Sequence, residues 1–331
     1  MKTFYCYCRI PELDGLRAVA VSAVVAYHLA PAYIPGGFLG VDLFFVLSGF
    51  LITSLLLDEE ARTGTISIRD FYLRRALRIL PPLATAIVLS LALDVASVKA
   101  AAAAFLFYAN FVFRGSLAGL AHTWSLAVEE HFYLVWPLAF VVLRRRRVKV
   151  LIAVMVAAIV MRLLAPFWEI SPGWSYQLTP MRADGLAIGC LAAMIPVEAP
   201  GLPALAIAVA CFFFVHLENY GMLLVGTTGF ALISAAAIRG ARSPLLRLRP
   251  MQYIGRRSYG LYLYHFPVSL WVDRLHLGAA ASICAKVLLA LALTEASYRT
   301  IERWALMLKE RLRSGRGSDI MLADAATTKS L

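Results

Sequence analysis

Long apolar runs recur along the whole chain and are separated by short polar segments. A membrane-spanning helix needs about 20 mostly apolar residues to cross roughly 30 Å of hydrocarbon, and these runs are of that order. The pattern predicts an all-α polytopic membrane helix bundle of about ten transmembrane helices. The spans are expected at residues 13–31, 39–57, 79–98, 123–143, 148–165, 180–196, 203–217, 220–238, 253–272 and 279–303.

Two stretches fall outside these spans. Residues 99–121 are alanine-rich and then aromatic, which indicates an interfacial or re-entrant helix rather than a further crossing. Residues 305–331 are polar and have no core-forming pattern, so a disordered cytoplasmic tail is expected there. The chain is therefore divided into a transmembrane domain, 1–304, and this tail, 305–331.

Composition supports a membrane protein. Hydrophobic residues make up 61% of the chain and charged residues 16%, with a mean hydropathy of +0.74. An ordinary soluble domain is roughly 45–50% apolar and about 25% charged. The apolar excess is too large for a soluble core of this size, and a multi-pass protein of the cell membrane is expected.

The net charge of +12 comes from basic residues in the short loops. With the amino terminus inside, most Lys and Arg residues fall in the segments that would then be cytoplasmic. The positive-inside rule explains this distribution and places both termini in the cytoplasm. The basic charge is therefore no sign of nucleic-acid binding, and no such partner is expected.

The first predicted span carries two polar residues that are expensive to place in hydrocarbon, Arg17 and His28. Their spacing of eleven residues is within about 20° of three full helical turns, so they share a face about 16 Å apart. Asp14 precedes Arg17 by three positions and can pair with it. Arg17 is expected toward the cytoplasm and His28 toward the outer side.

The fourth predicted span adds a polar stripe at the same outer level. His122, Ser125, Glu129 and Tyr133 follow one another at helical spacing and share a face, whereas the neighbours of Glu129, residues 130 and 131, are expected to point elsewhere. A structural bundle would rarely accept the cost of burying so many polar groups.

The ninth span contributes a third polar face with Ser258, Tyr262 and His265. We expect these three helices to bring their His, Glu, Tyr and Ser side chains into one interior region. No metal site is expected.

The third span begins in an arginine-rich segment with Arg74, Arg75 and Arg78. The positive-inside rule alone accounts for basic residues at such an end. Arg75 and Arg78 lie one turn apart, however, and would also suit a two-pronged grip on phosphate. The run 144–147 is explained by topology and is assigned no site.

Seven motifs of the chain occur together in the order known from one protein family. They are RIPELDGLRAVAVSAVVAYH, GGFLGVDLFFVLSGFLIT, FYLRRALRILPPL, HTWSLAVEEHFYLVWP, RADGLAIGC, SYGLYLYHFPV and YRTIERW. The chain resembles acyltransferase family 3, the bacterial transmembrane acyltransferases that O-acylate polysaccharides, lipopolysaccharide, lipids or antibiotics. The resemblance covers about residues 9–304 and implies that the transmembrane domain is an acyltransferase domain.

The resemblance assigns roles to the two arginine motifs. The family's arginine-x10-histidine motif falls on Arg17 and His28 with its spacing intact. Its RxxR element, associated with acyl-CoA binding, falls on Arg75 and Arg78. Acyl-CoA, with acetyl as the commonest acyl group, is therefore implied as a co-substrate, and no permanently bound cofactor is expected.

Two further motifs of the family supply supporting residues. WSLxxE falls on Trp124, Ser125 and Glu129, and GVDxFFVxSG falls on the stretch that contains Asp42 and Ser48. With Asp14, Ser258, Tyr262 and His265, these residues are expected to support the site or contact the acceptor.

Together these features predict an O-acyltransferase that moves an acyl group from cytoplasmic acyl-CoA to a hydroxyl of an envelope or exported carbohydrate. Arg75 and Arg78 would hold the phosphates, and the pantetheine arm would pass Arg17 and bring the thioester to His28. Histidine is the side chain whose unperturbed pKa suits a general base at neutral pH. His28 could deprotonate the acceptor or carry the acyl group itself.

The other polar groups would assist the transfer. Glu129 could orient His28 or bind the acceptor sugar, and Tyr262 and Ser258 could donate hydrogen bonds to the developing oxyanion. The alternative function is a membrane transporter or flippase, because polar groups within a bundle also mark a substrate pathway. Transport that does not depend on acyl-CoA would distinguish that alternative.

Overall fold

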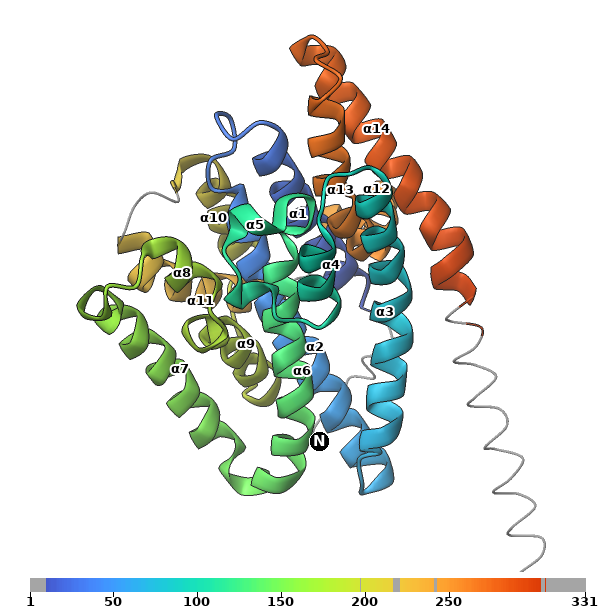
Figure 1. Cartoon of the computed structure of the whole chain (residues 1–331). Coiled ribbons are helices and arrows are strands. Elements are labelled where there is room, and N and C mark those ends of the chain that lie inside the picture. The colour runs from blue at the N-terminus through green and yellow to red at the C-terminus, as the bar shows by residue number, and fades with distance from the viewer. Residues whose placement is uncertain (1–9, 197, 217–220, 241–242, 305–306, 308–331) are drawn as a thin grey trace, which may run out of the picture.

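Every regular element in the described part of the chain is helical. The computed structural model describes residues 10–196, 198–216, 221–240, 243–304 and 307 (Figure 1). Its helices are α1 (Pro11–Leu29), α2 (Gly40–Thr63), α3 (Ile68–Ala92), α4 (Val98–Phe105), α5 (Arg114–Leu117), α6 (Thr123–Leu143), α7 (Arg147–Leu164), α8 (Pro172–Gln177), α9 (Thr179–Met194), α10 (Gly201–Phe214), α11 (Thr227–Arg239), α12 (Arg249–Arg256), α13 (Ser258–Asp273) and α14 (Ala279–Ser297). Apart from Met307, the predicted tail 305–331 lies outside the described residues.

Several helices are long and apolar enough to cross a membrane. In the described chain there are five such segments: Gly37–Thr63, Ile68–Ala92, Thr123–Trp168, Met222–Arg239 and Ala279–Glu302. The segment Thr123–Trp168 contains both α6 and α7, joined by a short turn at Arg144–Arg146. The prediction of an all-α membrane protein is therefore confirmed at this level.

Each of the remaining predicted spans also overlaps a helix, but a shorter or more polar one. Helices α9, α10 and α13 have 16, 14 and 16 residues, which is less than the roughly 20 residues of a typical crossing. Helix α1 has 19 residues but carries Glu12, Asp14 and Arg17 in its first two turns. Helix α9 packs against α2 and α7, and α1 packs against α12 and α13, whereas α10 packs mainly against α11 and leaves much of its surface exposed.

The connections between long helices gather at two ends of the molecule (Figure 1). In that view the α2–α3 and α6–α7 turns lie at the lower end, whereas the α13–α14 turn lies at the upper end. The segment 99–121 forms only short helices, among them α4 and α5, and α4 packs against α3. Helices α4 and α5, with 8 and 4 residues, are much shorter than a membrane crossing.

The predicted start of the third span was wrong by eleven residues. Helix α3 begins at Ile68 instead of residue 79, because the Ser67 side chain caps it by accepting a hydrogen bond from the Asp70 backbone N–H. Pro81 and Pro82 lie inside this helix without ending it. Arg75 and Arg78 consequently lie within α3, not at its end.

Two glycines allow α2 and α9 to approach closely. A methyl group at Gly49 of α2 would overlap the Leu186 backbone oxygen of α9, and one at Gly189 of α9 would overlap the Val46 backbone oxygen of α2. Small residues at such contacts let membrane helices pack through their backbones. The contact fixes α2, which carries part of the polar interior described below.

A fully buried arginine ties α7, α9 and α11 together. Arg162 donates to both carboxylate oxygens of Asp184, at 2.9 and 2.7 Å, and to the Thr228 hydroxyl at 2.5 Å. Its other donors reach the backbone oxygens of Met181 and Leu224. All five guanidinium N–H groups are thus satisfied, which makes this buried charge tolerable.

Candidate active site

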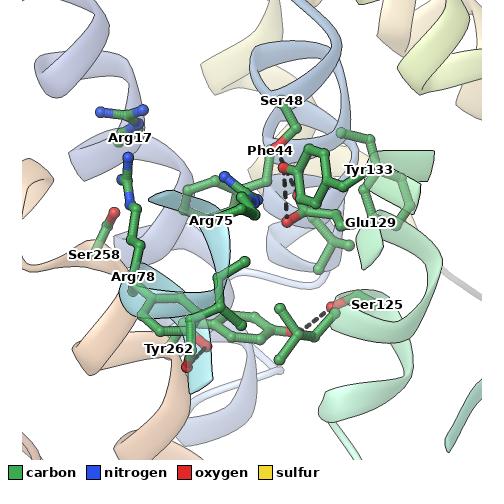
Figure 2. A pocket seen from close by; sticks show the side chains of 15 residues that line it. Arg17, Phe44, Ser48, Arg75, Arg78, Ser125, Glu129, Tyr133, Ser258 and Tyr262 are labelled. Carbon is green, nitrogen blue, oxygen red and sulfur yellow. Dashed lines mark hydrogen bonds between the residues drawn. The ribbon is translucent and has the colours of Figure 1, made fainter. Parts of the chain in front are cut away.

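A cavity with both apolar and polar walls lies in the middle of the bundle, between α1, α2, α3, α6 and α13 (Figure 2). Its empty volume, mouth included, is about 730 Å³. The lining residues are Arg17, Val41, Phe44, Phe45, Ser48, Arg75, Arg78, Ile79, Ser125, Leu126, Glu129, Tyr133, Ser258, Tyr259 and Tyr262. Helices far apart in the sequence therefore meet around one hollow, as the shared polar faces predict.

Three arginines face this cavity and are held to different degrees (Figure 2). Arg17 donates to Asp14 at 2.9 Å, the pairing that the sequence predicts. Arg75 lies 3.4 Å above the Tyr133 ring centroid and 3.7 Å from Glu130. Arg78 has no ion-pair partner in the part of the chain that the structure describes. Of the three guanidinium groups, that of Arg78 is therefore the most available to a ligand.

Glu130 does not line the cavity, and its contact with Arg75 was not predicted from the sequence. It lies beside Arg75 and counters part of its charge. Its neighbour His131 does point elsewhere, and its Nδ1 lies 2.7 Å from the Thr179 hydroxyl.

Beside Arg75, and across the cavity from Arg17 and Arg78, a carboxylate is held by two hydroxyl groups (Figure 2). Glu129 accepts a hydrogen bond from Ser48 at 2.8 Å and another from Tyr133 at 3.4 Å. Ser48 comes from α2, whereas Glu129 and Tyr133 lie one turn apart on α6. The carboxylate is thereby fixed in the wall, where it can accept a hydrogen bond from a ligand.

A second pair of hydroxyl groups closes the cavity on another side. The Ser125 and Tyr262 oxygens are 2.5 Å apart, and the Tyr262 hydroxyl also lies 2.8 Å from the His122 backbone oxygen, to which it can donate. Ser258, one turn before Tyr262 on α13, lines the cavity on the arginine side (Figure 2). All of the predicted hydroxyl-bearing residues therefore reach this hollow.

His28 does not line the cavity but lies beyond Tyr262, in contact with His265. The Nδ1 of His28 and the Nε2 of His265 are 3.1 Å apart. The ring of His122 packs against that of His265 with centroids 5.4 Å apart. Although three histidines meet here, the described residues contain no group of His, Cys, Asp and Glu side chains arranged to bind a metal.

The hydrogen bonds of His265 fix which nitrogen of His28 is free. The Tyr262 backbone oxygen can only accept, so the His265 Nδ1 at 2.7 Å from it carries the proton. The Nε2 of a neutral His265 then accepts, and His28 donates to it through Nδ1. The Nε2 of neutral His28 consequently keeps its lone pair.

Two further residues singled out from the sequence, Asp42 and Trp124, also lie outside the cavity wall. Asp42 is buried in an ion pair with Arg182, and Trp124 packs against Phe45 and Tyr176. Both support the wall from behind. Sequence reasoning missed the arginine partner because the two residues of the ion pair lie 140 positions apart; an arginine inside an apolar run was the available signal.

The positive-inside rule does not fully explain Arg147, the last residue of the basic run 144–147. Arg147 is buried, and it forms a two-pronged ion pair with Glu60 of α2, each contact 2.7 Å long. It also donates to the Phe140 backbone oxygen at 2.6 Å. Arg147 therefore clamps the α6–α7 turn to α2, a contact that charge counting cannot reveal.

Comparison with known proteins gives one consistent result. Residues 10–294 match the family described as acyltransferase domain. The chain is 34% identical to the putative peptidoglycan O-acetyltransferase YrhL of Bacillus subtilis, covering 89% of this chain and 54% of that protein. It is 30% identical to O-acetyltransferase OatA of Staphylococcus aureus (88% and 56% covered) and 32% identical to peptidoglycan O-acetyltransferase OatA of Listeria monocytogenes (78% and 49%). The chain spans about half the length of the curated relatives it matches. No solved structure matches it significantly.

Proposed function

The chain belongs to the acyltransferase domain family, and on that basis we propose that it is a membrane O-acetyltransferase. It transfers acetyl from acetyl-CoA to a hydroxyl of an envelope carbohydrate. One observation carries the proposal: a single cavity joins three arginines to a wall of hydroxyl and carboxylate groups, with a histidine pair beyond it.

The arginines form the donor side. The diphosphate of acetyl-CoA binds Arg75 and Arg78, whose planar guanidinium groups match phosphate oxygens in two-pronged hydrogen bonds. Arg17, paired with Asp14, faces the same space. The apolar walls of the cavity, among them Phe44 and Ile79, accept the pantetheine arm.

His28 acts as the base on the acceptor side. Its Nε2 takes the proton of the acceptor hydroxyl while the hydroxyl oxygen forms a bond to the thioester carbon. The C–S bond then breaks, and the proton passes to the departing CoA thiolate. In the alternative route, Nε2 attacks the thioester first and carries the acetyl group to the hydroxyl. His265 holds His28 in the required tautomer in both routes.

The polar groups of the cavity wall stabilise the thioester carbon's oxyanion and bind the acceptor. Tyr262 and Ser125 share one short hydrogen bond and can turn a donor toward the oxyanion that forms on the thioester carbon. Ser258 is the third hydroxyl of this wall. Glu129, fixed by Ser48, is placed to accept hydrogen bonds from the sugar hydroxyls of the acceptor.

We infer that the acceptor belongs to the peptidoglycan glycan strand, because two of the relatives are named for peptidoglycan. We also propose a topology of ten crossings in the cell membrane with both termini in the cytoplasm. The positive-inside distribution supports it, as does the gathering of the α2–α3 and α6–α7 turns at one end of the molecule (Figure 1).

The proposal is tested in cells that lack their own O-acetyltransferase and express the chain or a variant. His28→Asn keeps an amide N–H where Nδ1 donates to His265 but has no atom in place of Nε2. We expect this variant to abolish O-acetylation of purified peptidoglycan, measured by mass spectrometry. His276→Asn changes an exposed histidine far from the cavity and should have no effect. Substrate movement without acetyl-CoA would instead indicate a transporter.

A further inference from the structure

A second hollow lies beside the amino-terminal end of α1, outside the cavity. We call it the arginine basin; its lining residues are Pro11, Arg247, Arg249, Gln252, Tyr253, Arg256 and Arg257. Its empty volume is about 1060 Å³, open mouth included. Four of the seven lining residues are arginines, and they come from one short segment around α12.

Positive charge exceeds negative charge around the basin. Three carboxylates, Glu12, Asp14 and Glu295, pair with arginines here. The arginines in and next to the basin are Arg17, Arg247, Arg249, Arg256, Arg257 and Arg299. Arg249 is exposed and has no ion-pair partner among the described residues. An anion that entered the basin would therefore meet uncompensated charge.

Two arginines of the basin wall are held in place by neighbouring side chains. The Arg257 guanidinium lies 3.8 Å from the Tyr253 ring centroid and donates to Glu295 at 2.5 Å. Arg247 is held by Glu12. A basic residue that serves topology alone needs no such fixed position, whereas a binding site gains affinity when its groups are held before the ligand arrives.

The basin and the cavity meet at Asp14. Arg17, in the cavity wall, and Arg256, in the basin wall, both pair with this carboxylate, at 2.9 and 3.9 Å. The two residues that follow Arg256 also belong to different hollows: Arg257 lines the basin, and Ser258 lines the cavity. Close contact between α1 and α12 at Gly255 keeps these walls together.

We propose that the arginine basin binds the 3′-phosphorylated nucleotide end of acyl-CoA. This inference rests on the proposed function and extends it from the diphosphate to the far end of the donor. A charged nucleotide is least costly to hold where water still reaches it, which is the basin, while the neutral pantetheine arm enters the cavity past Arg17. Arg249 supplies the free charge for the 3′-phosphate.

The test is equilibrium binding to the purified full chain in neutral-lipid nanodiscs, using acetyl-CoA, acetyl-dephospho-CoA and acetyl-pantetheine. Arg249→Ala should weaken acetyl-CoA binding about tenfold, the lower range for a hydrogen bond to a charged group, and leave acetyl-dephospho-CoA and acetyl-pantetheine unchanged. Arg145→Ala removes another exposed arginine without a described partner, outside both hollows, and should change none of the three.

The outcomes separate this inference from the proposed function. If the unaltered chain binds none of the three donors, the proposed function fails. If it binds acetyl-CoA but Arg249→Ala weakens all three donors equally, or none, the basin is not the nucleotide site. An effect of Arg249→Ala that arises only after anionic lipid is added to the nanodiscs would assign the basin to a lipid headgroup and overturn the inference.

Discussion

Removal of Arg78 is the sharpest test of the donor side of the cavity. Arg17 is paired with Asp14, and Arg75 is held by Tyr133 and Glu130. Arg78 faces the same cavity with no described ion-pair partner. Its charge is therefore the one most available to a ligand, and Arg78→Ala should remove hydrogen bonds to the ligand without breaking an ion pair between described residues.

The size of the effect follows from the hydrogen bond that the substitution removes. A hydrogen bond to a charged group contributes about 1.5–3 kcal/mol, and about 1.4 kcal/mol corresponds to a factor of ten. We expect Arg78→Ala to weaken acetyl-CoA binding by roughly 10- to 150-fold, measured by isothermal titration calorimetry on the purified chain. The thermal unfolding temperature should stay close to that of the unaltered chain.

Arg74→Ala is the matched control on the same helix. Arg74 does not line the cavity; its side chain is 41% exposed and pairs with Glu59 at 3.2 Å. An exposed ion pair contributes about 0–1 kcal/mol to stability. Because Arg74 does not line the cavity, its removal should not change the affinity for acetyl-CoA. An unchanged dissociation constant in Arg78→Ala, or an equal weakening in Arg74→Ala, would refute the assignment and leave topology as the role of these arginines.

Three further outcomes test the supporting structure. Gly49→Ala should lower the free energy of unfolding by about 1–3 kcal/mol through overpacking, whereas Gly229→Ala, which has open space beside it, should not; thermal unfolding in detergent measures both. Asp184→Asn should lower the free energy of unfolding by about 3–5 kcal/mol, because the buried Arg162 loses its charged partner. An unchanged unfolding temperature would contradict this. His265→Leu removes the acceptor for the His28 Nδ1 proton and should reduce the acetylation rate at least about tenfold. His265→Gln keeps an acceptor oxygen and should retain more of the acetylation activity than His265→Leu. Equal acetylation rates in the two variants would show that His265 does not set the tautomer of His28.

Local spacing predicted the polar faces of single helices well. Asp14 and Arg17 pair because residues three apart are neighbours on a helix. Ser125, Glu129 and Tyr133 line one cavity for the same reason. These relations depend only on helical geometry, so they can be derived before any tertiary contact is known. The all-helical membrane class followed as directly from the apolar runs.

Contacts between distant segments could not be derived in this way. The pairing of Asp42 with Arg182 and of Glu60 with Arg147 depends on which helices pack together, and helical spacing does not contain that information. The contact of Arg75 with Glu130 likewise depends on the packing of α3 beside α6. The position of His28 outside the cavity wall also depends on α13, because its Tyr262 lines the cavity and its His265 contacts His28.

The central claim is that acetyl transfer depends on the free nitrogen of His28 next to the arginine-lined cavity. Its most direct test is the O-acetyl content of peptidoglycan from cells that express either the unaltered chain or His28→Asn at equal protein levels. We predict acetylation with the unaltered chain and none above background with His28→Asn. Undiminished acetylation with His28→Asn would contradict the claim.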